Sequence, residues 1–485
     1  MSNEHRSAKR VAVIGGGITG MAAAYTLQEK ARAAGLPVSF ILYEKSTNLG
    51  GKIVTDQQDG FVVEGGPDSF LAQKPWAAQL AQALGLEQEL IGTNQGKKKL
   101  YVVNRGRLTP MPDGVMLIIP TRFMPFVTSS LISWPGKIRM GMDFFIPSRK
   151  DDADESLGAF IRRRLGKEAL DKIAEPLMSG IHVSDPEQQS ILGTFPRFRN
   201  MEKQHGSLIR AMLAQRRASH ANRQGRSKPS AEEGSWKNSM FVSMRGGMMQ
   251  LVDALEKALT GGELMTGCEV TGVTPLESGY QIATADGKKQ DVDAVILTAP
   301  AFVASSLAAS FAPALSQALT SIRYVSTATV SLAFQQPDLS RMEGGVGFII
   351  PRRENRKITA CTASSIKFTQ RAPQNQVLLR CFVGGPGNEQ AVDHSDEQLI
   401  SDVRAELADL LGITAEPVLT RVYRWIKGNA QYDVGHLERV KHMHDLCAEI
   451  PGLFLSGAAY QGIGVPDCIH QGQQAAEQAF EFLGD

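Results

Sequence analysis

The stretch VAVIGGGITGMAAAY, residues 11–25, constrains the fold more than any other part of the chain. Its apolar, β-branched start is typical of a buried parallel strand. Gly15, Gly17 and Gly20 then form a G-x-G-x-x-G pattern, and an apolar helical pattern follows. The glycines permit a tight turn, a close backbone approach and close helix packing, and the helix N-terminus offers N–H groups to a diphosphate. The stretch predicts a dinucleotide site, with a purely structural glycine turn as the alternative.

A second apolar run, Val38 to Tyr43, predicts the next strand of the same unit, and Glu44 follows it directly. A carboxylate at this strand end is the expected partner of a ribose hydroxyl. The spacing from Gly15 to Glu44 exceeds the usual value of about 20 residues, so we expect an extended helix or loop between them. Gly50-Gly51 and Lys52 indicate another close backbone approach to the cofactor.

The C-terminal region carries a second glycine-rich turn between a short apolar strand and a helix. The strand is GLFLS, residues 452–456, and Gly457, Gly462 and Gly464 precede a helix expected to begin after Pro466-Asp467. Backbone N–H groups from both ends of the chain suit a bipartite ligand, which favours FAD over NAD. A glycine-rich turn that docks a terminal helix is the structural alternative.

Bulk properties narrow the class of protein. At 485 residues the chain exceeds one ordinary core, and its net charge of +2 gives no indication of nucleic-acid binding. Five scattered cysteines without C-x-x-C spacing indicate reduced thiols in a reducing compartment and no zinc site. The polar start and the lack of a long apolar run predict a cytoplasmic protein without a signal peptide or transmembrane segment.

Two segments in the first half are unusual. Residues 107–136 carry five prolines among apolar residues, which suits a membrane-surface patch, the mouth of an apolar cavity or a buried connection. Residues 215–238 are polar and basic, and predict a mobile loop.

Helical patterns lie between these segments. Short strands return after residue 240, so the dinucleotide domain is expected to be discontinuous, and residues 320–385 predict an antiparallel sheet.

At this point the chain resembles a known family. The segments GGGITGMAAAY, YEKSTNLGGK, EGGPDSFLAQK and GAAYQGIGVPDCIHQG are similar to the flavin amine oxidase superfamily. GPDSFL, EPLMSGIHVSDP and GIGVPDCI mark the protoporphyrinogen and coproporphyrinogen oxidase branch, and the likeness covers essentially the whole chain. Within that branch the chain resembles the soluble coproporphyrinogen III oxidases of monoderm bacteria.

The resemblance implies a mixed α/β fold with three parts. A discontinuous, Rossmann-like FAD-binding domain would comprise residues 1–74, 240–300 and 430–485. A substrate-binding domain with a mixed sheet would comprise residues 75–110 and 301–429. A mainly helical domain would be inserted at residues 111–239.

The resemblance also implies non-covalent FAD binding without a metal. The expected FAD contacts are Gly15, Gly16, Gly17, Ile18, Thr19, Gly20, Glu44, Lys45, Lys52, Gly66, Pro67, Asp68, Ser69, Val270, Trp425, Gly462, Ile463, Gly464 and Val465. Pro67-Asp68-Ser69 also fits an ordinary turn with a helix cap. Met21 departs from the family's usual leucine, but methionine fills the same space.

The implied reaction is a six-electron oxidation of a porphyrinogen in three two-electron steps. Hydride would pass to flavin N5 and O₂ would reoxidise the flavin, giving H₂O₂, so no protein group is assigned a certain catalytic role. Substrate propionates need cations. Lys74 follows the GPDSFL turn and is the first candidate, with an ordinary exposed lysine as the alternative; Arg352 and Arg353 are further candidates.

The expected activity is therefore oxidation of coproporphyrinogen III to coproporphyrin III in haem biosynthesis. The alternatives are the same chemistry on protoporphyrinogen IX, another oxidoreductase activity of this superfamily, such as amine oxidation, and a flavin-binding scaffold. Ferrochelatase is a candidate partner, and peripheral membrane contact is a candidate interaction.

Overall fold

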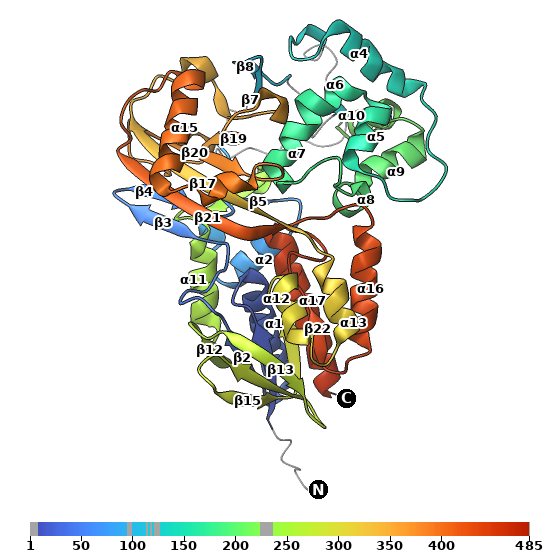
Figure 1. The fold of residues 1–485 in the computed structure, drawn as a ribbon, viewed down its shortest axis with the longest axis vertical. Coiled ribbons are helices and arrows are strands. Elements are labelled where there is room, and N and C mark those ends of the chain that lie inside the picture. The colour runs from blue at the N-terminus through green and yellow to red at the C-terminus, as the bar shows by residue number, and fades with distance from the viewer. Residues whose placement is uncertain are drawn as a thin grey trace.

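The computed structural model describes residues 8–94, 99–112, 115–116, 119–120, 127–223 and 236–484. Its lower part, near both chain ends, is built on a parallel sheet (Figure 1). Its upper part has a large mixed sheet on one side and a group of helices on the other. The three expected kinds of substructure are therefore present, and the predicted mixed α/β fold class is confirmed.

The lower sheet has five parallel strands in the order β12-β2-β1-β16-β22. They are β1 (Lys9–Ile14), β2 (Val38–Tyr43), β12 (Gly262–Met265), β16 (Ala294–Leu297) and β22 (Leu453–Leu455). Because successive side chains of a strand point to opposite faces, Val11 and Val13 join one core while Ala12 and Ile14 join the other. The strands come from three distant parts of the sequence, as expected of a discontinuous domain.

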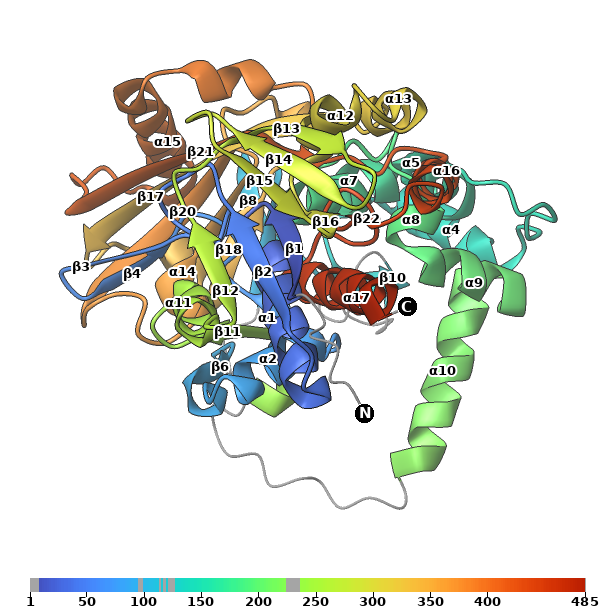
Figure 2. The same ribbon diagram turned by 90° about the horizontal axis from the view of Figure 1, so that it is seen from below.

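Both faces of this sheet are covered. On one face lie α1 (Ile18–Ala34), α2 (Trp76–Ala83), α11 (Met249–Ala258) and α17 (Val465–Gly484). On the other lie the antiparallel strands β13 (Val270–Pro275), β14 (Tyr280–Thr284) and β15 (Lys289–Val292), with α12 (Ala301–Ala308), α13 (Pro313–Thr320) and α16 (His436–Ala448). Helices α1 and α17, from opposite ends of the chain, lie side by side (Figure 2).

The upper sheet has seven strands in the order β21-β17-β20-β19-β18-β7-β8, of which only β18 and β7 pair in parallel. They are β7 (Lys99–Asn104), β8 (Arg107–Pro110), β17 (Tyr324–Gln335), β18 (Gly345–Ile349), β19 (Ala360–Ala363), β20 (Gln376–Gly384) and β21 (Leu419–Ala430). Helix α15 (Asp396–Leu411) packs on one face through an apolar core. The other face is turned towards the lower domain.

The remaining elements outside the helical part are short. The strands are β3 (Thr55–Gln58), β4 (Phe61–Glu64), β5 (Phe70–Leu71), β6 (Leu90–Gly92), β9 (Val115–Met116), β10 (Ile119–Pro120) and β11 (Phe241–Met244). The helical turns are η1 (Glu87–Glu89), η4 (Trp236–Asn238), η5 (Ser340–Met342), η6 (Arg352–Glu354), α14 (Ser364–Lys367) and η7 (Glu389–Asp393).

The helical part has an apolar core crossed by a buried ionic network. Its elements are α4 (Trp134–Gly141), η2 (Met142–Phe144), α5 (Leu157–Arg164), α6 (Lys167–Ala169), the π-helix η3 (Leu170–Ala174), α7 (Glu175–His182), α8 (Ile191–Thr194), α9 (Pro196–His205) and α10 (Leu208–Arg223). The Arg164 guanidinium is fully buried and pairs with Asp143 at 2.5 Å. Ser156 caps α5 by accepting the Ala159 N–H at 3.0 Å.

The structure describes only parts of the two unusual segments, residues 107–136 and 215–238. Residues 215–223 belong to α10 and residues 236–238 to η4, so the predicted loop is shorter at both ends; residues 224–235 lie outside the described residues. Much of the proline-rich segment also lies outside them. Among the helices described, none is long and apolar enough to cross a membrane.

Candidate cofactor and substrate site

The loop between β1 and α1 has the backbone geometry that its glycines predict. Gly15 has a φ of 117°, which side-chain-bearing residues rarely adopt. A Cβ on Gly20 would lie 2.0 Å from the Gly15 carbonyl oxygen, so α1 packs there only with glycine. Gly17 is the N-cap of α1, and a Cβ on it would meet no atom within 4 Å. The chain leaves open the space in front of Gly17 that a diphosphate would need.

The Glu44 carboxylate is fixed by the chain at the end of β2. One oxygen accepts the Gly16 N–H at 2.8 Å, and the other accepts the N–H and hydroxyl of Ser46 at 2.8 and 2.7 Å. Glu44 lines the cavity described below, and the oxygen that accepts the Gly16 N–H can accept a further bond. The carboxylate is therefore pre-oriented for ribose hydroxyls.

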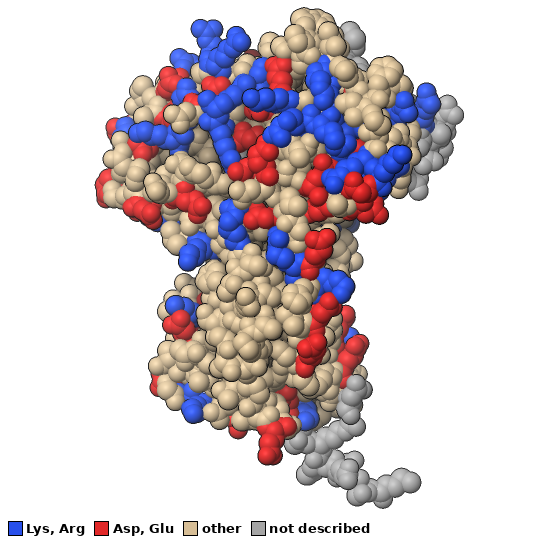
Figure 3. Space-filling model, turned by 45° about the vertical axis from the view of Figure 1, so that its right-hand side comes forward, with Lys and Arg blue, Asp and Glu red and all other residues tan. Residues whose placement is uncertain are grey.

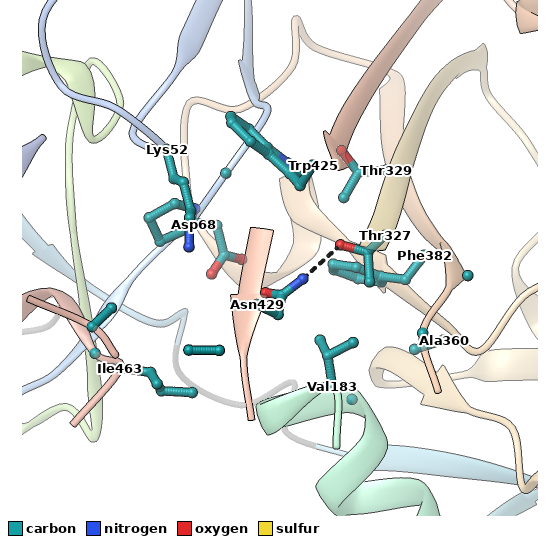
Figure 4. A pocket seen from close by; sticks show the side chains of 18 of the residues that line it. Lys52, Asp68, Val183, Thr327, Thr329, Ala360, Phe382, Trp425, Asn429 and Ile463 are labelled. Atoms are coloured by element: carbon teal, nitrogen blue, oxygen red, sulfur yellow. Dashed lines mark hydrogen bonds between the residues drawn. The ribbon is translucent and has the colours of Figure 1, made fainter. Parts of the chain in front are cut away.

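Lys52 brings its ammonium to the same cavity. The adjoining turn is tied to the glycine loop, because the Gly50 N–H donates to the Gly16 carbonyl at 2.8 Å. The Lys52 ammonium donates to the Gly428 carbonyl, and burial lowers the pKa of this ammonium. Figure 4 shows Lys52 and Asp68 close together on one side of the cavity.

The turn at residues 65–69 is held from the upper sheet. The Gly65 carbonyl accepts bonds from Trp425 Nε1 at 3.0 Å, Thr329 Oγ1 at 3.2 Å and Arg380 Nη2 at 3.0 Å. Asp68 pairs with Lys367 at 2.8 Å. Burial opposes ionisation of Asp68, but Lys367 and Arg380 hold the pKa of this carboxyl well below its usual range.

The C-terminal glycine turn is held by Tyr432. The Gly462 N–H donates to the Tyr432 hydroxyl at 2.8 Å, and this hydroxyl donates to the Ala458 carbonyl at 2.9 Å. The ring of His436 stacks on that of Tyr432, with 3.8 Å between the centroids. Helix α17 begins at Val465, three residues earlier than the position expected.

These segments surround one cavity of about 2020 Å³. Ordinary ligand pockets measure roughly 300–1,000 Å³, so the cavity has room for a dinucleotide and a second large ligand. Its wall continues from the glycine loop to the upper sheet and to α7, where Figure 4 shows Val183, Phe382 and Trp425 around the space. The Asn429 amide donates to Thr327 Oγ1 at 3.1 Å on the same wall.

Most of the expected cofactor residues line this cavity. They are Gly15, Gly17, Ile18, Thr19, Glu44, Lys45, Lys52, Gly66, Pro67, Asp68, Ser69, Val270, Trp425, Gly462, Ile463, Gly464 and Val465. Gly16 and Gly20 lie behind the wall. The N–H of Gly16 binds Glu44, and Gly20 packs against Gly15.

The expected substrate cations are placed less favourably. Lys74 lines the cavity but pairs with Asp467 at 2.6 Å. Arg352 lines it too, and pairs with Glu175 at 3.4 Å and with Asp185 at 3.2 Å. Arg353 lies outside the wall and donates to the side chain of Asn104.

The sequence analysis missed several lining cations, among them three that are exposed. Lys99, Arg197 and Lys427 line the cavity, and the described residues place no carboxylate within ion-pair distance of them. Lys99 ends a run of three lysines and the other two stand singly, and no local motif distinguishes any of them from a surface cation. The part of the chain that the structure describes holds no cluster of side chains suited to a metal ion.

Comparisons with known proteins agree with this geometry. The family model described as flavin containing amine oxidoreductase matches residues 18–479. Coproporphyrinogen III oxidase of Bacillus subtilis (strain 168) is 38% identical over 476 residues, 98% of each chain. Protoporphyrinogen oxidase 2 of Arabidopsis thaliana is 28% identical over 500 residues, 98% of this chain and 95% of that one. A solved Exiguobacterium sp. 255-15 structure, assigned as a protoporphyrinogen oxidase, is 33% identical with a TM-score of 0.85, covering 98% of this chain and 99% of that one.

Proposed function

The chain belongs to the flavin-containing amine oxidoreductase family, and we propose that it oxidises coproporphyrinogen III to coproporphyrin III in haem biosynthesis. The observation that carries the substrate assignment is the 38% identity, over 98% of both chains, to a coproporphyrinogen III oxidase. Identity to a plant protoporphyrinogen oxidase is lower, at 28%.

FAD is the cofactor, and the described residues fit it. The open space at Gly17, the oriented carboxylate of Glu44 and the glycine turn at residues 462–464 offer separate contacts for a diphosphate, a ribose and a second portion of a dinucleotide. These three elements come from both ends of the chain and face one cavity. A mononucleotide would leave part of this cradle without a partner.

The bound flavin supplies the electron acceptor that the protein's own side chains lack. The protein's contribution is to hold the macrocycle in a water-poor space and to position its carboxylates. Val183, Phe382 and Ile463 give that space apolar walls (Figure 4). The reducing equivalents are proposed to pass to O₂, which would yield H₂O₂.

Charge at the cavity rim supports a tetracarboxylate substrate. Lys99, Arg197 and Lys427 are exposed lining cations without a described carboxylate partner, so their charges are available to propionates. Lys74 and Arg352 are proposed as further propionate contacts that must share their charge with Asp467 and Glu175. Arg353 does not line the cavity, so we propose it only as a contact outside the cavity wall.

A surface on the helical part supports peripheral membrane contact. Trp134 and Ile138 of α4, Met142 of η2 and Phe145 directly after η2 have exposed fractions of 64, 66, 49 and 80%. Lys137 lies over the Trp134 ring at 4.7 Å. Aromatic and aliphatic side chains flanked by cations suit an anionic lipid surface. Figure 3 shows Lys and Arg gathered on the upper half of the face in view.

A cytoplasmic location and docking to ferrochelatase complete the proposal. Five free cysteines, four of them buried, are compatible with a reducing compartment. A porphyrin product is poorly soluble and reactive, so direct transfer to a metal-inserting enzyme would protect it.

An assay on two porphyrinogens tests the proposed activity. The FAD-loaded protein is given coproporphyrinogen III or protoporphyrinogen IX, with and without O₂, while porphyrin fluorescence, H₂O₂ and flavin bleaching are recorded. We expect kcat/KM to be higher for coproporphyrinogen III, with bleaching but no sustained turnover without O₂. A preference for protoporphyrinogen IX would reverse the substrate assignment. Turnover of an amine alone would replace it, and a yellow protein inactive on all three would indicate a scaffold.

A further inference from the structure

A buried charge cluster lies beneath the turn at residues 65–69. Its members are Glu64, Asp68, Lys367, Arg371 and Arg380. Lys367 pairs with Asp68 at 2.8 Å, and Arg371 pairs with Glu64 at 3.8 Å. Arg380 is the cation of this cluster for which the described residues provide no carboxylate within ion-pair distance. With both acids ionised, the cluster therefore has one more positive than negative charge.

Arg380 is both rigidly held and incompletely satisfied. It is 4% exposed, and its Nη2 donates to the carbonyls of Gly65 and Gly66 at 3.0 and 2.6 Å. Its Nε is buried without a hydrogen-bond partner, and so is the hydroxyl of Ser331 on the paired residue of the neighbouring strand. Burial of a charge without an ion-pair partner lowers the stability of the fold. Such a charge in the wall of a ligand cavity therefore indicates a functional role.

The position of Arg380 indicates what it acts on. It lies in the cavity wall, with its guanidinium 5.0 Å from the Phe382 ring, another wall residue. The two carbonyls that it holds belong to the turn that also presents Pro67, Asp68 and Ser69 to the cavity. Thr329 and Trp425 bind the Gly65 carbonyl from the same sheet. Arg380 thus connects the upper sheet to the cofactor side of the cavity.

We propose that Arg380 is a positioning residue of the flavin site, which clamps the Gly65–Gly66 turn and whose uncompensated positive charge favours the reduced cofactor. Reduction of a flavin by two electrons with uptake of one proton adds one negative charge. A fixed cation in a low-dielectric wall stabilises that added charge more than it stabilises the oxidised ring. The inference rests on FAD occupying this cavity but not on the identity of the substrate.

Two substitutions separate the clamp from the charge. Arg380→Gln removes the charge, and we expect the two-electron reduction equilibrium of bound FAD to become at least about tenfold less favourable, a fall of about 30 mV in midpoint potential. Arg380→Lys keeps the charge but lacks the planar fork. The midpoint potential of Arg380→Lys should fall by less than about half of the shift expected for Arg380→Gln. This variant should bind FAD about tenfold more weakly, because one of the two carbonyls loses its donor.

Arg371→Gln is the matched control. Arg371 is buried in the same cluster and donates to the Ser243 hydroxyl at 2.8 Å, but it does not line the cavity. Burial already raises the pKa of Glu64, so the carboxyl left by Arg371→Gln can take up a proton and keep the cluster charge nearly unchanged. We expect less than about a third of the potential shift seen with Arg380→Gln.

The potential is measured by equilibration with redox dyes, and FAD affinity by fluorescence titration of the apoprotein. Neither needs a porphyrinogen, so loss of the substrate assignment leaves the test intact. Unchanged potentials in both Arg380 variants, or an equal shift in Arg371→Gln, would overturn the proposal. If Arg380→Gln does not accumulate as a folded flavoprotein, Arg380→Lys decides. Parental FAD affinity in that variant, or a potential lowered as far as expected for charge removal, would also refute the proposal.

Discussion

Replacement of Gly17 by alanine isolates the cofactor contact from the fold. Gly17 has a φ of −70°, which alanine adopts without strain, and its added Cβ would meet no protein atom within 4 Å. Nothing in the described structure therefore opposes the substitution. The methyl group would instead enter the cavity at the N-terminus of α1, where the diphosphate is expected.

The expected magnitudes are small for stability and large for binding. Loss of glycine's freedom in the unfolded chain stabilises the apoprotein by about 0.4–1 kcal/mol. Alanine is a poorer N-cap residue than glycine by a similar amount, so the net change in stability should be small. A methyl group that keeps phosphate oxygens from the loop N–H groups removes charge-assisted hydrogen bonds worth about 1.5–3 kcal/mol each. Loss of two such bonds would raise the Kd for FAD about 10²- to 10⁴-fold.

Gly141→Ala is the matched control, because Gly141 also has open space around a would-be Cβ and an αR backbone with φ of −61°. It lies at the end of α4 and does not line the cavity. Denaturant unfolding of both apoproteins and FAD titration of both variants give the comparison. We expect similar stabilities, with weakened FAD binding only in Gly17→Ala. Parental affinity in Gly17→Ala would refute the assignment of this loop to the diphosphate.

Three further predictions concern the substrate, pH and the surface. Lys74→Ala should raise KM for coproporphyrinogen III with unchanged FAD content, and an unchanged KM in steady-state assays would remove Lys74 from the site. Burial lowers the pKa of His436 to about 4, from the value of 6.5 of an exposed histidine, so the unfolded chain binds more protons between these values. The free energy of unfolding should therefore fall on the order of 2 kcal/mol between pH 6.5 and pH 4. Urea titrations of His436→Phe should show a smaller fall over this range, and an equal fall would assign the pH dependence to another group. The double substitution Trp134→Gln/Phe145→Gln should abolish flotation with anionic vesicles, whereas Ile426→Gln, at a 58% exposed site outside α4, should not; equal flotation of all variants would exclude the α4 surface.

The parts of the site that local sequence predicts are those made by one turn. The glycine loop follows from backbone geometry within 15–20, and Glu44 was found although its spacing is long. The structure explains that spacing, because α1 spans 17 residues and a left-handed Gly35 ends it before β2. A motif of this kind can be read locally because its physical causes are local.

The electrostatic state of the site could not be predicted in the same way. Lys74 and Asp467 are 393 residues apart in sequence and form an ion pair at 2.6 Å. Arg352 meets Glu175 and Asp185 only because the upper sheet and α7 lie together. Whether a cation is available to a ligand depends on such partners, and no pattern along the chain reports them.

The large upper sheet also aligns the part of the cavity wall where cofactor contacts are expected. The Gly65 carbonyl takes hydrogen bonds from β17, β20 and β21, so the cofactor-side turn is aligned by the strands that form the opposite cavity wall. Any change in the separation of the two levels would disturb these bonds. We therefore expect substitutions in these three strands to displace the turn at residues 65–69, and with it one wall of the cavity, as directly as substitutions in the glycine loop displace another.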